Sequence, residues 1–146
     1  MGREAMKSVV LLGAATALLV ATTMAAPAVE PVDQQTMRSI IDQQIEAFRA
    51  DDGSRAYAIA SPTVRMMFGS PDAFMVMVRQ GYQPVYRPKS YLFGPARDGD
   101  SGPELSVLIE DQAGSSWTAV YSFEKQPDGS WAVSGCRLVK TPEQSA

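Results

Sequence analysis

Two adjacent carboxylates, Asp51 and Asp52, are the best candidates for catalysis in this sequence, because they follow a segment with an apolar stripe. A carboxyl group in an apolar pocket can have a raised pKa and act as a general acid or base. The hydroxyl of Tyr57 or Tyr121 would then be its partner. Asp-Asp-Gly is also an ordinary way to end a helix with both acids in water. Both interpretations stay open.

Three further side chains could bind a ligand at the rim of a site. Tyr82, Tyr86 and Arg87 lie in a segment that Pro84 and Pro88 stiffen. Aromatic rings and a guanidinium on such a backbone could hold a peptide or an anionic ligand. The alternative is a plain connector between a helix and a sheet.

Metal and thiol chemistry have little support. Met66, Met67, Met75 and Met77 lie close together, and thioethers bind Cu(I). Met75 and Met77 are two positions apart on a predicted helix and face different directions, so we expect them to pack in a core. For Cys136 we expect a small buried hydrophobic residue, with a reactive thiol or a disulfide between two chains as alternatives. We therefore expect no metal and no cofactor.

The composition excludes several classes of protein. The chain has 146 residues, no histidine, one cysteine and a net charge of −3. The missing histidine excludes a Ser-His-Asp triad and a histidine metal site. One cysteine excludes a disulfide within the chain. The acidic balance gives no basic footprint for nucleic acid, so we expect no nucleic-acid partner.

The first 28 residues are typical of a secretory signal peptide. Arg3 and Lys7 precede a stretch without charges, Ser8–Ala26, whose centre is apolar. We expect residues 1–28 to be a leader, which would make the protein periplasmic or secreted. An uncleaved membrane anchor is the alternative and would be the only contact with a membrane. Residues 29–140 are predicted to form one domain, and residues 141–146 a flexible tail.

Apolar residues at helical spacing dominate the first half of the domain. The longest stripe predicts a helix that begins near Asp33 and is stopped by Asp51–Ser54. A shorter helix over 56–60 must break before Pro62, and a further turn over 63–68 is closed by Gly69. A capping serine followed by Pro71 starts a helix that ends at Gly81. The apolar residues of the long stripe are Met37, Ile40, Ile41, Ile45 and Phe48.

After Pro84 the apolar period changes to two, which predicts strands. We expect hairpin turns at Asp111–Gly114 and Pro127–Gly129, a longer polar loop over Arg97–Pro103, and a bulge at Gly135-Cys136. Helices grouped before antiparallel strands predict an α+β domain, with the helices on the concave face of a curved sheet of about four strands. The expected strands contain Tyr91–Phe93, Leu105–Glu110, Trp117–Glu124 and Trp131–Leu138.

The chain contains five distinctive segments: Ile45–Asp52, Ala60–Pro62, Phe68–Ser70, Gly81–Pro88 and Gly129–Cys136. Together they resemble the domain-of-unknown-function family DUF4864, whose members are small and mostly exported bacterial proteins. The resemblance spans about residues 33–140 and implies no activity. The order of elements also resembles the nuclear-transport-factor-2-like cone, which hosts isomerases, cyclases, dehydratases and plain binding domains, so the fold does not choose among these functions.

The cone implies a cavity between the helices and the sheet. An apolar pocket with tyrosine hydroxyls as orienting groups is one interpretation, and a filled core is the other. From their apolar phase, the residues expected to face the cavity are Tyr57, Phe74, Met77, Ile109, Trp117, Tyr121 and Val133.

Three functions are compatible with these features. The first is a non-catalytic module that binds a small apolar ligand or an envelope protein. The second is an acid–base isomerase or dehydratase that uses Asp51 or Asp52 with a tyrosine. The third is a protein that forms homodimers through the outer face of its sheet, where Leu108, Thr118 and Val120 would lie.

Overall fold

The computed structural model describes residues 29–142, so the predicted leader, residues 1–28, and residues 143–146 of the predicted tail lie outside the described part of the chain. Within that part, five helices precede four strands. No helix among residues 29–142 is both long and apolar enough to cross a membrane. The elements are α1 Pro31–Arg49, α2 Gly53–Ile59, α3 Pro62–Phe68, α4 Pro71–Gly81, α5 Gln83–Tyr86, β1 Ser90–Gly99, β2 Gly102–Glu110, β3 Ser116–Lys125 and β4 Trp131–Lys140.

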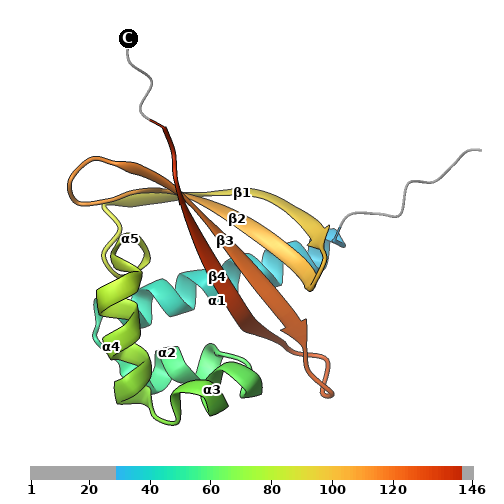
Figure 1. Ribbon diagram of the computed structural model, residues 1–146. Coiled ribbons are helices and arrows are strands. Elements are labelled where there is room, and N and C mark those ends of the chain that lie inside the picture. The colour runs from blue at the N-terminus through green and yellow to red at the C-terminus, as the bar shows by residue number, and fades with distance from the viewer. Residues whose placement is uncertain (1–28, 143–146) are drawn as a thin grey trace, which may run out of the picture.

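The strands form one sheet in the order β1-β2-β3-β4, and every neighbouring pair is antiparallel. The sheet is strongly twisted and open, and the helices gather on one of its faces (Figure 1). This arrangement confirms the predicted α+β fold. The core lies where α1 and α4 face the inward side chains of the sheet, among them Leu105, Tyr121 and Phe123.

The long helix α1 forms because its apolar residues recur on one face. Met37, Ile41 and Ile45 are fully buried and Phe48 is 2% exposed, so the stripe packs against the sheet. A proline in the first turn and Asp33 near the N-terminus favour helix initiation.

The shorter helices begin and end at the signals that predict them. The Asp52 side chain accepts the backbone N–H of Arg55 and caps α2. Ser61 and Ser70 cap α3 and α4 in the same way. Gly69, with a φ of 77°, ends α3 in the left-handed conformation that glycine adopts without strain. Residues 50–71 therefore turn sharply three times, which folds α2, α3 and α4 beneath the sheet.

The structure corrects three details of the predicted helices and strands. The polar segment Arg97–Pro103 is not a loop: β1 and β2 continue through it, with Arg97 opposite Glu104, and meet in a turn at residues 100–101. An ion pair of 3.1 Å between these two side chains replaces apolar packing there. The bulge of β4 falls at Ser134, one residue before the predicted place. The short helix α5 lies in the segment expected to be a connector.

Candidate functional site

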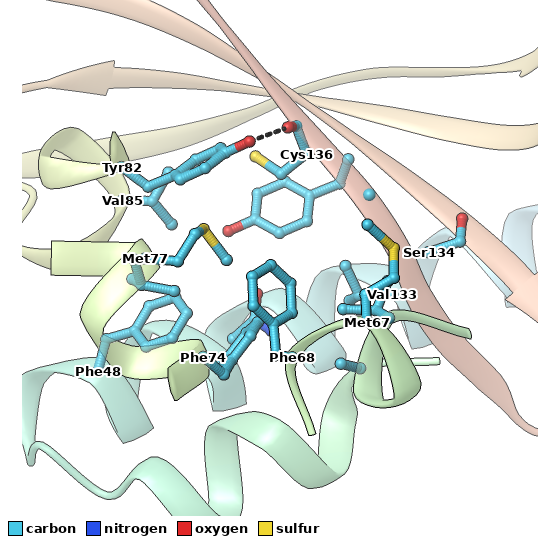
Figure 2. Close-up of a pocket in the computed structure, with 16 residues that line it drawn as sticks. Phe48, Met67, Phe68, Phe74, Met77, Tyr82, Val85, Val133, Ser134 and Cys136 are labelled. Atoms are coloured by element: carbon cyan, nitrogen blue, oxygen red, sulfur yellow. Dashed lines mark hydrogen bonds between the residues drawn. The ribbon is translucent and has the colours of Figure 1, made fainter. Parts of the chain in front are cut away.

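A cavity of about 330 Å³ lies between the helices and β4 (Figure 2). Side chains from α1, α3, α4 and α5 and from strands β3 and β4 surround it. None of the lining residues is charged. The apolar wall consists of Phe48, Ala60, Val64, Met67, Phe68, Phe74, Met77, Val78, Val85 and Val133, and the remaining lining residues are Gln44, Tyr82, Tyr121, Ser134, Gly135 and Cys136.

Phe74 of α4 holds the aromatic part of the wall together. Its ring lies 5.7 Å from that of Phe68 and 6.4 Å from that of Phe48, centroid to centroid. Tyr57 packs against the same ring at 5.8 Å but does not line the cavity. Because aromatic pairs prefer tilted and edge-on arrangements, the contacts among these rings stabilise this side of the cavity wall. Met67, a residue that is 73% exposed, also lines the cavity.

The hydroxyl of Tyr121 is the exceptional polar group of the cavity. Tyr121 is 1% exposed, and its hydroxyl is buried without a hydrogen-bond partner among the described residues. Burial raises the pKa of Tyr121 well above 10, so the phenol keeps its proton. A buried polar group without a partner costs folding free energy, which makes this hydroxyl a feature that needs an explanation.

Tyr82 and Cys136 are neutral neighbours of this hydroxyl. Cys136 lies opposite Tyr121 in the register of β3 and β4. The Tyr82 hydroxyl donates a hydrogen bond of 3.0 Å to the backbone carbonyl of Cys136 (Figure 2). Burial raises the pKa of the Cys136 thiol to about 12, so it is not a thiolate at neutral pH.

The structure places the predicted cavity residues in two groups. Phe74, Met77, Tyr121 and Val133 line the cavity. Tyr57, Ile109 and Trp117 do not.

Each residue of the second group lies elsewhere for a clear reason. Ile109 and Trp117 are opposite each other near the end of β2 and the start of β3, where the sheet extends past the cavity. The Trp117 indole donates 2.8 Å to Asp111. The Tyr57 hydroxyl donates to the backbone carbonyl of Arg65. An alternating pattern identifies the face of a strand but not the position along it, so it does not separate Trp117 from Tyr121.

Sequence reasoning missed Gln44, which is 3% exposed and lines the cavity from α1. The signal was present: Gln44 is seven positions after Met37 and three after Ile41, so it falls inside the apolar stripe. A polar residue in the phase of a buried stripe indicates a polar position in the interior.

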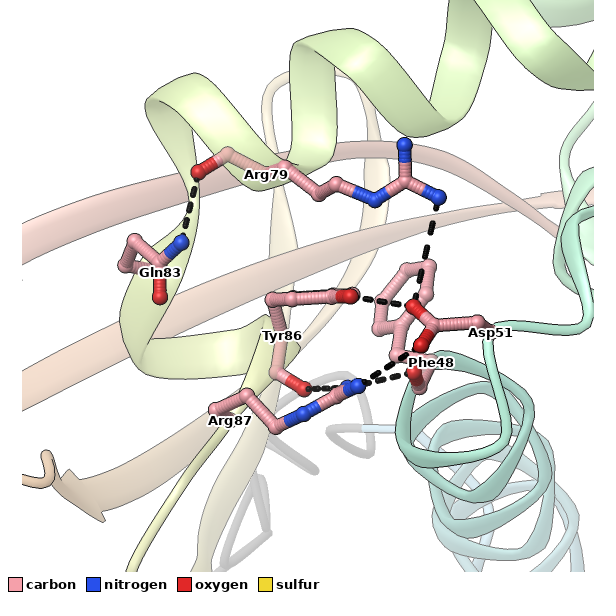
Figure 3. A network of polar contacts seen from close by, with 6 residues as sticks. All are labelled: Phe48, Asp51, Arg79, Gln83, Tyr86 and Arg87. Atoms are coloured by element: carbon pink, nitrogen blue, oxygen red, sulfur yellow. Dashed lines mark hydrogen bonds and ion pairs between the residues drawn. The ribbon is translucent and has the colours of Figure 1, made fainter.

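The rim candidates belong to two different places. Tyr82 lines the cavity, whereas Tyr86 and Arg87 lie in a polar cluster around Asp51 (Figure 3). Arg87 donates 3.1 Å to Asp51 Oδ2, and Tyr86 donates to Oδ1. Arg79 lies 3.9 Å from the same carboxylate. The Arg87 guanidinium also stacks 3.9 Å from the Tyr86 ring centre.

This cluster keeps Asp51 ionised and away from the cavity. The hydrogen bond from Tyr86 and the charges of Arg87 and Arg79 lower the pKa of Asp51 below its ordinary value of 3.8. A general base in an apolar pocket would have the opposite shift. Asp51 has a positive φ of 50° where α1 ends, and its partners tie α1 to α5. Asp52 caps α2 and does not line the cavity.

The four clustered methionines do not form a common site. Met75 is 2% exposed and packs in the core, whereas Met66 is 82% exposed. Met67 and Met77 lie on the cavity wall. Among residues 29–142, no group of three His, Cys, Asp or Glu residues is placed to hold a metal ion.

Comparison with known proteins identifies a family for the chain but no activity. No curated protein and no solved structure matches the chain. The resemblance to the nuclear-transport-factor-2-like cone therefore stays a prediction from the order of elements. The profile of the family described as "Domain of unknown function (DUF4864)" matches residues 30–146, which is most of the chain. The chain belongs to this family.

Proposed function

We propose that this protein is a non-catalytic module that binds a small apolar ligand in the cavity between its helices and β4. The observation that carries the proposal is a cavity of about 330 Å³ whose lining residues include no charged side chain. Ligand pockets have volumes of about 300–1,000 Å³ and are mostly apolar with few polar groups. An engineered apolar cavity of about 150 Å³ stays dry and binds benzene, so this cavity fits a ligand of roughly twice that size.

Acid–base catalysis receives less support from the same geometry. The isomerase or dehydratase considered above needs Asp51 or Asp52 in contact with its substrate. Asp51 is instead bonded to Tyr86 and Arg87 outside the cavity, and Asp52 caps a helix. The tyrosines of the cavity are neutral and have no acidic partner among its lining residues. Binding without chemistry therefore agrees best with the residues present.

A cavity-filling variant tests the proposal. Val64 lines the cavity from α3, and Phe68, four residues later on the same face of this helix, also lines it. None of the residues of α3 is buried, so Val64→Trp should occupy part of the cavity at a modest cost in stability. The wild-type domain should gain melting temperature with saturating naphthalene, because a ligand that binds only the folded state stabilises it. Val64→Trp should lose that gain.

A matched control separates filling from a general effect of the new side chain. Val76 is also a valine on a helix, but it is 46% exposed and lies outside the cavity. Val76→Trp should keep the response to naphthalene. If the wild-type domain does not respond to naphthalene or to a panel of lipids and metabolites, the proposal is wrong.

Self-association through the sheet is a second candidate, and the strand register favours it. One row of paired residues crosses all four strands: Leu92 pairs with Leu108, Leu108 with Thr118, and Thr118 with Val139. Leu92 is 70% exposed and Leu108 50% exposed. Val120 is only 8% exposed and adds little to this row. Sedimentation velocity should show a concentration-dependent dimer that Leu108→Lys abolishes; a monomer at all concentrations would exclude this candidate.

Export is part of the proposal, and it rests on the sequence of the first 28 residues. The positive leader and its uncharged apolar stretch support a cleaved signal peptide. Native mass spectrometry of protein purified from its own cell envelope tests this directly. We expect a mass that lacks the leader, and the same spectrum would reveal a retained ligand or a bound envelope protein. A full-length mass would favour the anchor.

A further inference from the structure

We infer that the ligand of the cavity is a neutral molecule that accepts one hydrogen bond from the hydroxyl of Tyr121. This inference rests on the proposed function and names the chemical class of the ligand. A mostly apolar body would fill the space among the aromatic residues, and a carbonyl-type oxygen would face Tyr121.

The hydroxyl of Tyr121 is the first step of the argument. Tyr121 lines the cavity, is 1% exposed and has no hydrogen-bond partner among the described residues. Phenylalanine would fill the same space in a core without leaving a polar atom unpaired. A ligand that accepts a hydrogen bond from this hydroxyl would supply the missing partner.

The neighbouring tyrosine shows the contrast. Tyr82 lines the same cavity, but its hydroxyl already donates to the carbonyl of Cys136 at 3.0 Å. The Cys136 thiol is protonated at neutral pH, because burial raises its pKa to about 12, and a thiol is a weak hydrogen-bonding group. Of the two tyrosine hydroxyls of the wall, that of Tyr121 is therefore the one without a partner among the described residues, and it is also the buried one; the amide of Gln44 and the hydroxyl of Ser134 are the other polar side chains of the wall. Since a phenol donates more readily than it accepts, the matching ligand group is an acceptor.

The charge of the ligand follows from the rest of the wall. The lining residues include no lysine or arginine. Arg79 and Arg87 face the carboxylate of Asp51, outside the cavity. A carboxylate or phosphate that entered the cavity would lose its hydration without gaining a counter-charge, which is strongly unfavourable. The cavity should therefore reject fatty acids and other anions.

Three probes of one size separate these properties. 2-Acetylnaphthalene has a carbonyl acceptor, 2-isopropylnaphthalene has the same shape without it, and 2-naphthoate carries a negative charge. Their dissociation constants are measured by isothermal titration with wild type, Tyr121→Phe and the matched control Tyr82→Phe. The control removes a hydroxyl from the same cavity, but one that is already bonded within the protein.

The expected result is a loss of affinity that is confined to the ketone and to Tyr121→Phe. Tyr121→Phe should weaken the ketone about three- to tenfold, the range that one neutral hydrogen bond gives. The hydrocarbon should bind this variant at least as well as wild type. Tyr82→Phe should change the affinity for the ketone by less than about twofold, and 2-naphthoate should bind wild type at least about tenfold more weakly than the ketone.

A spectroscopic measurement on wild type keeps the test independent of any variant's folding. The carbonyl stretching frequency of the bound ketone should fall below its value in a hydrocarbon solvent, as hydrogen bonding requires. An unshifted frequency, or equal losses of ketone and hydrocarbon in Tyr121→Phe, would overturn this inference and leave the proposed function in place. Tight binding of 2-naphthoate would overturn the neutral character. No binding of any probe to wild type would overturn the proposed function, and the inference with it.

Discussion

At the scale of single residues, two tyrosines of one cavity differ in how their hydroxyls are satisfied. The hydroxyl of Tyr82 donates to the Cys136 carbonyl, whereas that of Tyr121 has no partner among the described residues. Removing an unpaired buried hydroxyl removes the free-energy cost of burying it, whereas removing a bonded hydroxyl leaves its acceptor unpaired. The same substitution should therefore have opposite effects on stability at the two positions.

Tyr121→Phe should raise the free energy of unfolding of the ligand-free domain by about 1 kcal/mol, and Tyr82→Phe should lower it by about 1 kcal/mol. Urea denaturation followed by circular dichroism measures both values under the same conditions. A lower stability for Tyr121→Phe would mean that its hydroxyl already has a partner in the folded protein.

Asp51 gives a prediction about pH. Its pKa is lowered, first by the hydrogen bond from Tyr86, so the ionised carboxylate stabilises the fold above its ordinary pKa of 3.8. That contribution is lost as the pH falls through the lower pKa of the folded state. Asp51→Asn should therefore reduce the urea midpoint at pH 7, and the difference from wild type should shrink as the pH falls below about 4.

The neighbouring residue is the control for this variant. Asn tolerates the positive φ of 50° at position 51, so Asp51→Asn tests the charge and not the backbone. Asp52→Asn should change the midpoint little at pH 7, since Asn and Asp are equally good N-caps of a helix such as α2. A constant gap between Asp51→Asn and wild type at all pH values would contradict the ionic explanation.

At the scale of elements, α3 is the helix that packs least against the core. None of its residues is buried, whereas α4 buries Phe74, Met75 and Val78. Nevertheless α3 contributes Val64, Met67 and Phe68 to the wall of the cavity. An element with few buried apolar contacts opens at low free energy, so α3 is the part of the wall best suited to admit a ligand.

Hydrogen exchange followed by mass spectrometry should therefore show faster exchange in residues 62–68 than in the middle of α1 or in α4. Naphthalene at saturation should slow exchange in α3 more than in β1, which contributes no residue to the cavity. Equal protection of α3 and α4 in the free protein would contradict this prediction.

The helices of this chain were predictable wherever a local signal exists. Ser70 followed by Pro71 marks the start of α4, and Gly69 marks the end of α3, because capping and left-handed glycine act over three or four residues. The four-residue α5 has only half of this signal, since Pro84 lies in its first turn but no side chain caps its N-terminus. The turn at residues 100–101 was missed because polar strands at a hairpin tip look like a loop when apolar alternation is the only criterion.

At the scale of the molecule, the cavity depends on contacts that local patterns do not encode. Asp51 meets Arg87 across 36 positions of the chain, and the indole of Trp131 donates 3.2 Å to Asp33 across 98 positions. Alternation in β3 predicts that Trp117 and Tyr121 share the inward face, and both do pack against the core. Which of them reaches the cavity depends on where the helices end beneath the sheet, and that follows from long-range packing.

The same long-range contacts predict that the domain unfolds as one unit. The core includes residues of α1, α2, α4 and α5 together with three strands, so no element has a separate core of its own. The two tryptophans report on different regions: Trp117 lies in β3, bonded to Asp111, and Trp131 joins the start of β4 to α1. Trp117→Phe and Trp131→Phe each leave one fluorescent reporter.

In each variant, the urea midpoint from the remaining tryptophan should coincide with the midpoint from far-ultraviolet circular dichroism. The two variants need not be equally stable, since each loses a different indole hydrogen bond, so the comparison is made between probes within one variant. If the fluorescence of Trp131 changed at lower urea than the circular dichroism, the α1–β4 contact would open before the sheet. The cavity would then lose a wall before global unfolding, and ligand binding would fail while most of the secondary structure persisted.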